Sequence, residues 1–416
     1  MVKIKDQFIK SIGILVSGSL LAQLITLISA PLMTRLFSVN DIGIYTYIIT
    51  IAYLFLPVIN ARYELLIVTE KDENTLNAGI KLCGIICLVF SLFLSLGYGI
   101  YFFINPKYHQ FVNVFFGIPI LLVIAGFIEI LVEYNNRYKQ YHLLTKANLV
   151  KSCIQGIFIV IFGVLNFGSI GLILSHFISQ IFCLYVQSKK ILGNIKNILS
   201  VKNVDVFRFG IKNYRLPLYS IPAAIANNLS YLCLNFFIEI LFGMVALGYY
   251  SLSFRILGMP LSLISHNVGM VFLKEASQQY NNNGEFRGTL LKMTRFLIML
   301  SIPIAILIYY FAPIACGIYF GTEWTIAGEY AKSLTIMFAC RFIVSPLTAS
   351  MVIIKKNNIE FLMQFAFLIT AGVVYVYAKN IGLDVLSFLQ FINGAYSALY
   401  LIYWVVLYNL SGKHGG

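Results

Sequence analysis

Twelve apolar segments, each long enough to cross a bilayer, account for most of this chain of 416 residues. Only 11% of the residues are charged, whereas a soluble domain carries about 25%, so the charges that would coat a water-exposed surface are missing. A helix that spans a membrane needs about 20 mostly apolar residues. The sequence therefore predicts an all-α integral membrane protein with twelve transmembrane helices, at 11–34, 42–67, 79–103, 111–134, 148–166, 168–187, 216–240, 246–272, 290–311, 328–351, 359–378 and 384–408.

The basic residues between these segments predict the orientation of the chain. Lys and Arg are enriched on the cytoplasmic side of membrane proteins. If the N-terminus is cytoplasmic, 24 of the 30 Lys and Arg residues fall in cytoplasmic segments, of which 188–215 is the richest. We therefore expect a multi-pass protein with both termini in the cytoplasm. The net charge of +14 then indicates topology signals or contacts with anionic membrane lipids, and no nucleic-acid partner.

An internal repeat divides the chain near its middle. Leu36–Tyr47 reads LFSVNDIGIYTY and Leu241–Leu252 reads LFGMVALGYYSL, with an offset of 205 residues and no gap. Six predicted spans separate the two stretches, so both halves have the same orientation. Parallel repeats of this kind predict two six-helix lobes, 1–204 and 205–416, related by a pseudo-two-fold axis around a central cavity.

Arginines inside the predicted spans indicate a site for an anion. A charge near the bilayer centre costs roughly 2.5–3.5 kcal/mol, so it normally faces protein or a watery cavity. Arg255 lies about nine residues into its span, too deep to reach the interface easily, and Arg341 is also deep in its span. Arg35 ends the first span, where an interfacial anchor is the simpler interpretation. For Arg255 the structural alternative is an ion pair with Glu239 or Glu129.

The carboxylates of the first lobe are candidates for ion coupling. Glu129 is the deep carboxylate of the fourth span, and Arg62 and Glu64 close the second span in the stretch NARYELLIV. Glu129 is a candidate proton or cation site, whereas Arg62 and Glu64 are interpreted as a structural or gating ion pair. The histidines and cysteines show no metal-ligand spacing, and no nucleotide-binding or hydrolase motif occurs. We expect a transporter without metal or cofactor, coupled to H⁺ or Na⁺, and no enzyme.

Four stretches together resemble the Wzx-type polysaccharide flippases of the multidrug/oligosaccharidyl-lipid/polysaccharide exporter superfamily. They read SGSLLAQLITLISAPLMTRLFSVNDIGIYTY, INARYELLIV, NYRLPLYSIPAAIANNLS and LGYYSLSFRILGMPLSLI, and the resemblance covers essentially the whole chain. It implies alternating access that moves an undecaprenyl-pyrophosphate-linked oligosaccharide repeat unit to the outer leaflet of the bacterial cytoplasmic (inner) membrane. It also implies a role in O-antigen or capsule biosynthesis, in association with a polysaccharide polymerase and assembly proteins.

The arginines agree with that substrate, because a guanidinium gives a pyrophosphate charge-assisted, often bidentate, hydrogen bonds. Arg255 and Arg35 match arginines in the family's motifs, while Arg341 rests on its depth alone. Three alternatives stay open. A cation-coupled drug or metabolite antiporter of the same fold would call for deep carboxylates rather than arginines. A polymerase or lipid-linked glycosyltransferase would need a large outer loop, and a flippase for another lipid-linked glycan, such as the peptidoglycan precursor, is hard to distinguish.

Overall fold

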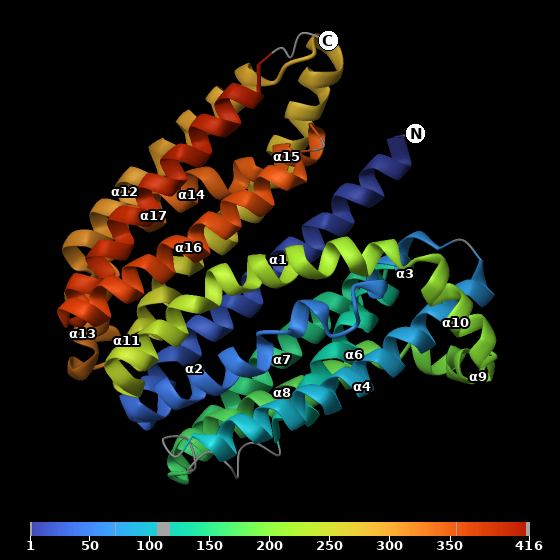
Figure 1. Ribbon diagram of the computed structural model, residues 1–416, viewed down its shortest axis with the longest axis horizontal. Coiled ribbons are helices and arrows are strands. Elements are labelled where there is room, and N and C mark those ends of the chain that lie inside the picture. Colours follow the sequence, from blue (N-terminus) through green and yellow to red (C-terminus); the bar gives the residue numbers. More distant parts are fainter. Residues whose placement is uncertain (1, 71, 106–116, 355, 413–416) are drawn as a thin grey trace. The chain divides into compact units, whose positions relative to one another are not determined.

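The computed structural model describes residues 2–412 except 71, 106–116 and 355, and this part of the chain is helical without a strand (Figure 1). The α-helices are α1 (Val2–Leu36), α2 (Val39–Tyr53), α3 (Leu66–Thr69), α4 (Glu73–Ile104), α6 (Gly117–Arg137), α7 (Tyr141–Val164), α8 (Gly168–Ser188), α9 (Ile195–Ser200), α10 (Asn203–Lys212), α11 (Arg215–Asn283), α12 (Arg287–Phe320), α13 (Thr325–Ser333), α14 (Thr335–Val344), α15 (Ser350–Ile353), α16 (Asn357–Ile381) and α17 (Val385–Leu410).

The predicted all-α membrane fold is confirmed. Among the described residues, 9 helices are long and apolar enough to cross a membrane, and Leu20–Leu36 and Thr335–Ala349 are shorter apolar helices. Two predicted spans, 216–240 and 246–272, are the two arms of the 69-residue helix α11, which changes direction at Gly243 (φ 83°). Glycine adopts this conformation without a Cβ clash. The tenth predicted span is discontinuous and consists of α13, α14, a 3₁₀ turn at Ser345–Ala349, and α15.

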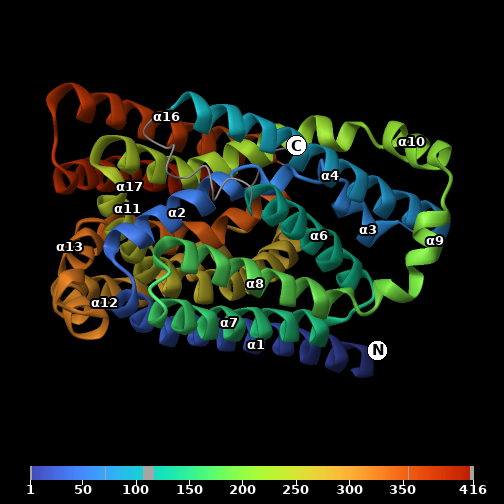
Figure 2. The same cartoon turned by 90° about the horizontal axis from the view of Figure 1, so that it is seen from below.

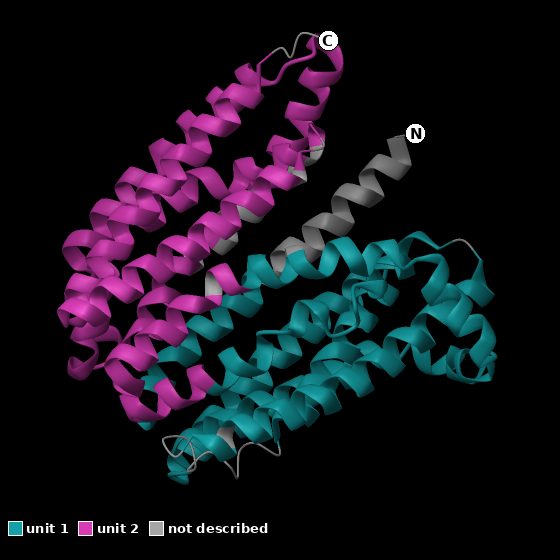
Figure 3. Ribbon diagram, in the orientation of Figure 1, with its two compact units in different colours: residues 1–37, 48–228 teal, residues 38–47, 229–416 magenta. Residues whose placement is uncertain are grey.

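The chain forms two compact units, which Figure 3 colours separately. Unit 1 contains residues 1–37 and 48–228, and unit 2 contains residues 38–47 and 229–416. The division therefore falls inside α11 rather than between residues 204 and 205, where counting spans places the lobe boundary. The start of α11 stays with unit 1 because the Asn228 side-chain amide donates to the carbonyl oxygens of Tyr53 (3.0 Å) and Leu54 (2.6 Å).

Within unit 2, the two copies of the sequence repeat meet at glycines. A Cβ atom on Gly43 would overlap the carbonyl oxygen of Met244, and one on Gly248 would overlap the carbonyl oxygen of Val39. The offset of 205 residues relates Gly43 to Gly248 and Val39 to Met244, so the contact is reciprocal. Such reciprocity is the mark of a two-fold interface, and it explains why the glycine is kept in both copies of the motif.

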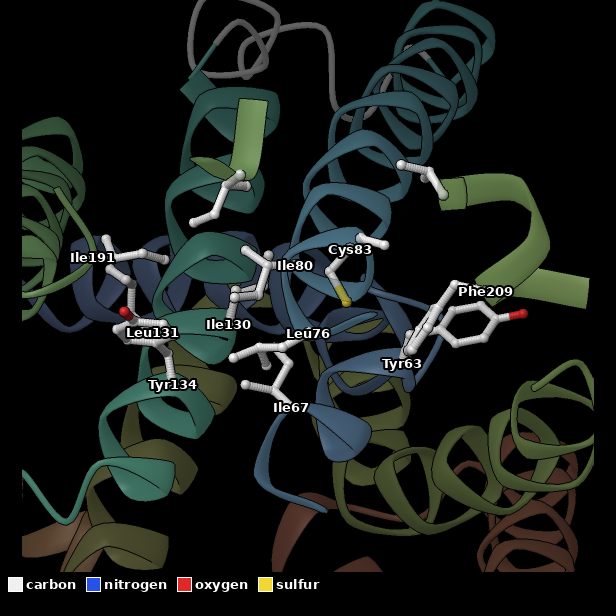
Figure 4. Packing of buried hydrophobic residues seen from close by; sticks show 13 residues of the cluster. Tyr63, Ile67, Leu76, Ile80, Cys83, Ile130, Leu131, Tyr134, Ile191 and Phe209 are labelled. Carbon is white, nitrogen blue, oxygen red and sulfur yellow. The ribbon is translucent and has the colours of Figure 1, made fainter. Parts of the chain in front are cut away.

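Unit 1 is built from helices that pack side by side. α7 packs against both α1 and α8, as Figure 2 shows, and α6 packs against α4 and α8. The core of this unit extends to α10, because the Tyr63 and Phe209 rings lie 6.3 Å apart beside Leu76 and Cys83 (Figure 4). The Tyr63 hydroxyl also donates to the carbonyl oxygen of Gly210 (3.1 Å). These contacts therefore fix α10 on the first half of α4.

Candidate functional site

The second span is broken in its middle, close to the charges expected to couple ions. α2 ends at Tyr53, a 3₁₀ turn follows at Leu56–Val58, and a second one spans Tyr63–Leu65. Between them Ala61 (φ 51°) and Arg62 (φ 66°) are left-handed, which is uncommon for residues other than glycine. Irregular backbone at membrane depth is tolerated where protein satisfies its polar groups or where it lines a watery cavity.

Side chains of unit 1 satisfy several of the backbone groups that this break releases. Asn228 bonds the carbonyl oxygens that follow α2, as described above. The Tyr98 hydroxyl donates to the Ile51 carbonyl oxygen (2.6 Å), and an Arg62 guanidinium nitrogen donates to the Pro57 carbonyl oxygen (3.4 Å). The Asn60 amide donates to the Gly126 carbonyl oxygen on α6 (3.0 Å). Side-chain hydrogen bonds therefore stabilise the break, which positions residues 60–65 against α6.

The structure brings Arg62, Glu64 and Glu129 together in unit 1. Arg62 forms an ion pair of 3.7 Å with Glu64, whose side chain is only 7% exposed. Glu64 also interacts electrostatically with Glu129 and Glu133 on α6. Glu129 has the most exposed side chain of the three carboxylates, since Glu64 is buried and Glu133 is half-buried. Neighbouring carboxylates of this kind favour the uptake of a proton or a cation between them.

Two residues that the sequence analysis did not select extend this group of charges. Lys151 lies within α7 and interacts electrostatically with Glu129 and His176. The buried His176 ring nitrogen Nε2 lies 2.7 Å from the Tyr53 hydroxyl, to which the Gln180 amide donates (2.9 Å). Hydrogen bonds thus join Tyr53, His176 and Gln180 at the end of α2, and the charge of Lys151 influences both His176 and Glu129.

The sequence carried one usable signal for these two residues. Lys151 stands three residues inside the predicted span 148–166, and His176 stands in the middle of the span 168–187. Both are ionisable groups at membrane depth, which is by default a functional position. Their partners come from other helices of the same unit, and no spacing along the chain reveals that.

In unit 2, Arg255 lies on the second arm of α11 and is half-buried. It interacts electrostatically with the hydroxyl-bearing ring of Tyr45. Within the described residues no ion pair of Arg255 with a carboxylate is found. A role of the Arg255 guanidinium in binding an anion stays a prediction.

Arg341 lies on α14, beside the ring of Phe254, which precedes Arg255 in the sequence. Its guanidinium carbon is 5.7 Å from the ring centres of both Phe254 and Phe338. It also lines an internal cavity of about 20 Å³, in which the Ser230 hydroxyl donates to the Gln364 amide oxygen (2.8 Å). A cavity of this size holds a water molecule and is too small for a pyrophosphate. Contact of Arg341 with a substrate stays a prediction.

Arg35 lies in the last turn of α1 and is exposed. It belongs to unit 1 but is not part of the group around Glu64 and Glu129. Asp41, six residues further on, accepts a hydrogen bond from the Ser38 hydroxyl (2.6 Å) and from its backbone amide. Among the described residues no group of His, Cys, Asp and Glu could hold a metal ion.

Comparison with known proteins gives one family match. The model of the family described as "Polysaccharide biosynthesis protein" matches residues 32–329 of this chain. No curated protein matches the chain.

Solved structures with a similar fold include transporters whose titles name the MOP superfamily. A structure titled "Inward-facing conformation of a multidrug resistance MATE family transporter of the MOP superfamily" matches with a TM-score of 0.71 at 12% identity and covers 94% of this chain and 93% of its own. A MOP superfamily transporter from Pyrococcus furiosus, whose title reports reversed polarity of the binding pocket, matches with a TM-score of 0.62 at 12% identity, covering 95% and 93%. At this identity the likeness establishes the fold.

Proposed function

Since this chain belongs to the polysaccharide biosynthesis protein family and has the fold of the MOP superfamily transporters, we propose that it is a lipid-linked oligosaccharide flippase. The expected resemblance to the Wzx-type members of this superfamily is confirmed at the level of family and fold. The proposed substrate is an undecaprenyl-pyrophosphate-linked repeat unit for O-antigen or capsule synthesis. It is moved from the cytoplasmic to the outer leaflet by alternating access, without enzymatic chemistry.

The observation that carries this proposal is Arg255, a half-buried guanidinium in a spanning helix for which the described residues show no ion pair with a carboxylate. A guanidinium in a low-dielectric site binds a pyrophosphate through charge-assisted hydrogen bonds, and lysine does so only as a point charge. Arg255 is therefore the proposed head-group ligand. Arg35 and Arg341 are proposed as further contacts, with Arg341 also supporting α11 through Phe254.

The charges of unit 1 are proposed to couple transport to H⁺ or Na⁺. Glu129 is the exposed carboxylate of the group. The charges of Arg62, Glu64 and Lys151 interact electrostatically with this group. Glu129→Gln keeps the shape of the side chain and removes its charge, so we expect transport to become insensitive to an imposed pH or sodium gradient. The measurement is the transport rate in proteoliposomes with and without the gradient. A wild-type response of Glu129→Gln to both gradients would exclude Glu129 as the coupling residue.

The same carboxylates also fit the second candidate, a cation-coupled drug or metabolite antiporter of this fold. The two proposals differ in unit 2, where an antiporter for cationic drugs has no use for Arg255. For the flippase we further propose location in the bacterial cytoplasmic membrane with both termini inside. Neighbours in that membrane are the polysaccharide polymerase and assembly proteins.

The test compares wild type, Arg255→Ala and Arg255→Lys in a strain that lacks the native gene. Lipid-linked repeat units are counted in each leaflet, together with the amount of protein in the membrane. We expect Arg255→Ala to accumulate units in the cytoplasmic leaflet at normal protein level, with Arg255→Lys intermediate. Arg295→Ala, an exposed arginine of α12, is the matched control. An unchanged leaflet distribution after deletion of the whole gene would refute the flippase and favour the antiporter.

A further inference from the structure

Helix α10 has two apolar faces. Val206 and Phe209 are each 4% exposed and belong to the core that α10 shares with α4. Val204, Phe207 and Ile211 are 66%, 69% and 57% exposed. A spacing of three and four residues places these three side chains on one side of the helix, opposite the face that packs on α4. An exposed row of large apolar side chains is unfavourable in water.

The exposed apolar row continues on both sides of α10. Leu199 at the end of α9 is 66% exposed, and Leu218 near the start of α11 is 59% exposed. The residues that follow Leu218 enter the predicted span 216–240. The segments on either side of α10 therefore add exposed apolar side chains close to a predicted span, and exposed apolar surface indicates a contact.

A polar cavity of about 810 Å³ lies beside this row, between α9, α10 and the start of α4. Lys202, Arg208 and Lys212 line it together with Asn74 and Asn197. Arg208 and Lys212 lie on α10 to one side of its exposed apolar row, and Lys202 immediately precedes the helix. An amphipathic helix at a membrane surface has this arrangement, with apolar side chains in the acyl region and cations among the headgroups.

The acidic residues of the cavity do not cancel its positive charge. Asp205 lies 3.8 Å from Arg208, and both side chains are more than half exposed, so this pair contributes little. Glu73 lies 3.9 Å from Arg137 and accepts a hydrogen bond from the Tyr138 hydroxyl (3.1 Å). Within the described part of the chain, Lys202 and Lys212 form no ion pair.

Hydrogen bonds hold the walls of the cavity in place. The Lys81 ammonium on α4 donates to the carbonyl oxygens of Leu199 (3.2 Å) and Val201 (2.6 Å). The Asn194 amide donates to the side-chain oxygen of Asn77 on α4 (2.9 Å). The cavity is thus preformed, and a ligand that enters it does not have to order the segment first.

We propose that this cavity and the exposed face of α10 bind an anionic phospholipid of the adjacent leaflet. Its phosphate contacts Lys202, Arg208 and Lys212, and its acyl chains lie along Val204, Phe207 and Ile211. The adjacent apolar row selects a lipid over a free phosphate, because a soluble anion leaves that row in water. The inference does not depend on what the protein transports.

The test measures the melting temperature of the full-length protein in neutral detergent with added lipid. We expect phosphatidylglycerol to raise it and phosphatidylcholine to have little effect. Each basic residue near an anionic surface contributes about fivefold to binding, so Lys202→Ala with Arg208→Ala and Lys212→Ala should lower the affinity for phosphatidylglycerol on the order of 100-fold. The control removes three exposed cations of unit 2, by Lys274→Ala, Lys292→Ala and Arg295→Ala, and should retain wild-type affinity.

The same melting experiment is repeated with glycerol phosphate and with inorganic phosphate in place of the lipid. If either reproduces the stabilisation, the site binds a soluble anion and the lipid proposal is overturned. An equal response of the triple variant and wild type to phosphatidylglycerol also overturns it.

A second measurement leaves the basic residues intact, in case the triple variant does not fold. A photo-reactive benzoylphenylalanine replaces Phe207 in protein reconstituted with phosphatidylglycerol, and the matched position is Asn282, an exposed polar residue at the end of α11. We expect a lipid adduct at position 207 at least tenfold more abundant than at 282. Equal yields at the two positions would contradict the proposed contact.

Discussion

In unit 1 the ionisable side chains around Glu64 and Glu129 lie near opposite charges, and in unit 2 the guanidinium of Arg341 lies beside aromatic rings. Glu64 pairs with Arg62, and Glu129 interacts with Lys151. Arg341 instead faces the rings of Phe254 and Phe338, and Arg255 has Tyr45 as its electrostatic neighbour. An acid–base group can take up and release a cation, whereas a guanidinium keeps its charge and suits an anion. We therefore expect the two units to serve different ligands.

The largest effect on stability is expected at the Arg62–Glu64 pair. Removing one partner of a buried pair leaves an uncompensated charge, so Arg62→Met should destabilise the protein by about 3 kcal/mol, at the lower end for buried pairs. Arg62 retains some exposure, with 28% of its side chain accessible. The measurement is the free energy of unfolding by reversible detergent denaturation.

The double variant Arg62→Met with Glu64→Gln is the control for this prediction. It removes both charges, so most of the lost stability should return. If the single and double variants are equally unstable, the loss reflects the hydrogen bond from Arg62 to the Pro57 carbonyl oxygen rather than the ion pair.

A smaller effect is expected at Arg341, because a cation over an aromatic ring contributes about 0.5–2 kcal/mol depending on its burial. Arg341→Leu should lower the free energy of unfolding by about 1–2 kcal/mol, and Arg341→Lys by less, since it keeps the charge. The matched control is Lys332→Leu, a more exposed cation 5.4 Å from the centre of the Tyr309 ring. A larger loss at Lys332 than at Arg341 would argue against aromatic support of the unit 2 arginine.

Most of the fold was predictable from the sequence, because length and apolar composition alone determine which segments can span a bilayer. The repeat also located Gly43 and Gly248, which the structure places in reciprocal contact. The breaks within the second and tenth spans were not predictable, since the backbone groups that they release are satisfied by distant side chains such as Asn228 and Asn60. Pro57 was a visible signal for the first of these breaks.

The site was less predictable. Depth along a helix selected Arg255, Arg341 and Glu129, but it does not tell which neighbours a side chain meets. Lys151 looked like a loop cation because it stands near a span end, and its interaction with Glu129 depends on how α6 and α7 lie together. The association of Arg341 with a water-sized cavity was likewise hidden, because the cavity is formed by residues from four separate helices.

The smallest effect is expected at a surface charge, Asp72, outside the spans. Its carboxylate accepts hydrogen bonds from the Thr75 hydroxyl and backbone amide (2.7 and 2.8 Å) at the start of α4, and these bonds lower its pKa. The stabilisation is therefore complete above the unfolded pKa of about 3.9 and disappears as the pH falls through the lower folded value. Asp72→Ala should lower the melting temperature by about 1–2 °C at pH 7.

The pH dependence distinguishes this cap from a packing effect. The difference between wild type and Asp72→Ala should vanish at a pH below the folded pKa of Asp72, and Asn74→Ala in the same helical turn should show no such dependence. A difference that persists in acid would mean that Asp72 acts through something other than its charge.

The contrast between the two units is tested most directly by the binding of undecaprenyl pyrophosphate to purified protein. Wild type, Arg255→Ala and Glu129→Gln are compared by the same titration. Loss of charge-assisted hydrogen bonds should weaken binding to Arg255→Ala by about 10- to 100-fold, while Glu129→Gln should bind as wild type does. The opposite pattern, with normal binding to Arg255→Ala and weakened binding to Glu129→Gln, would contradict the assignment of anion binding to unit 2 and of coupling to unit 1.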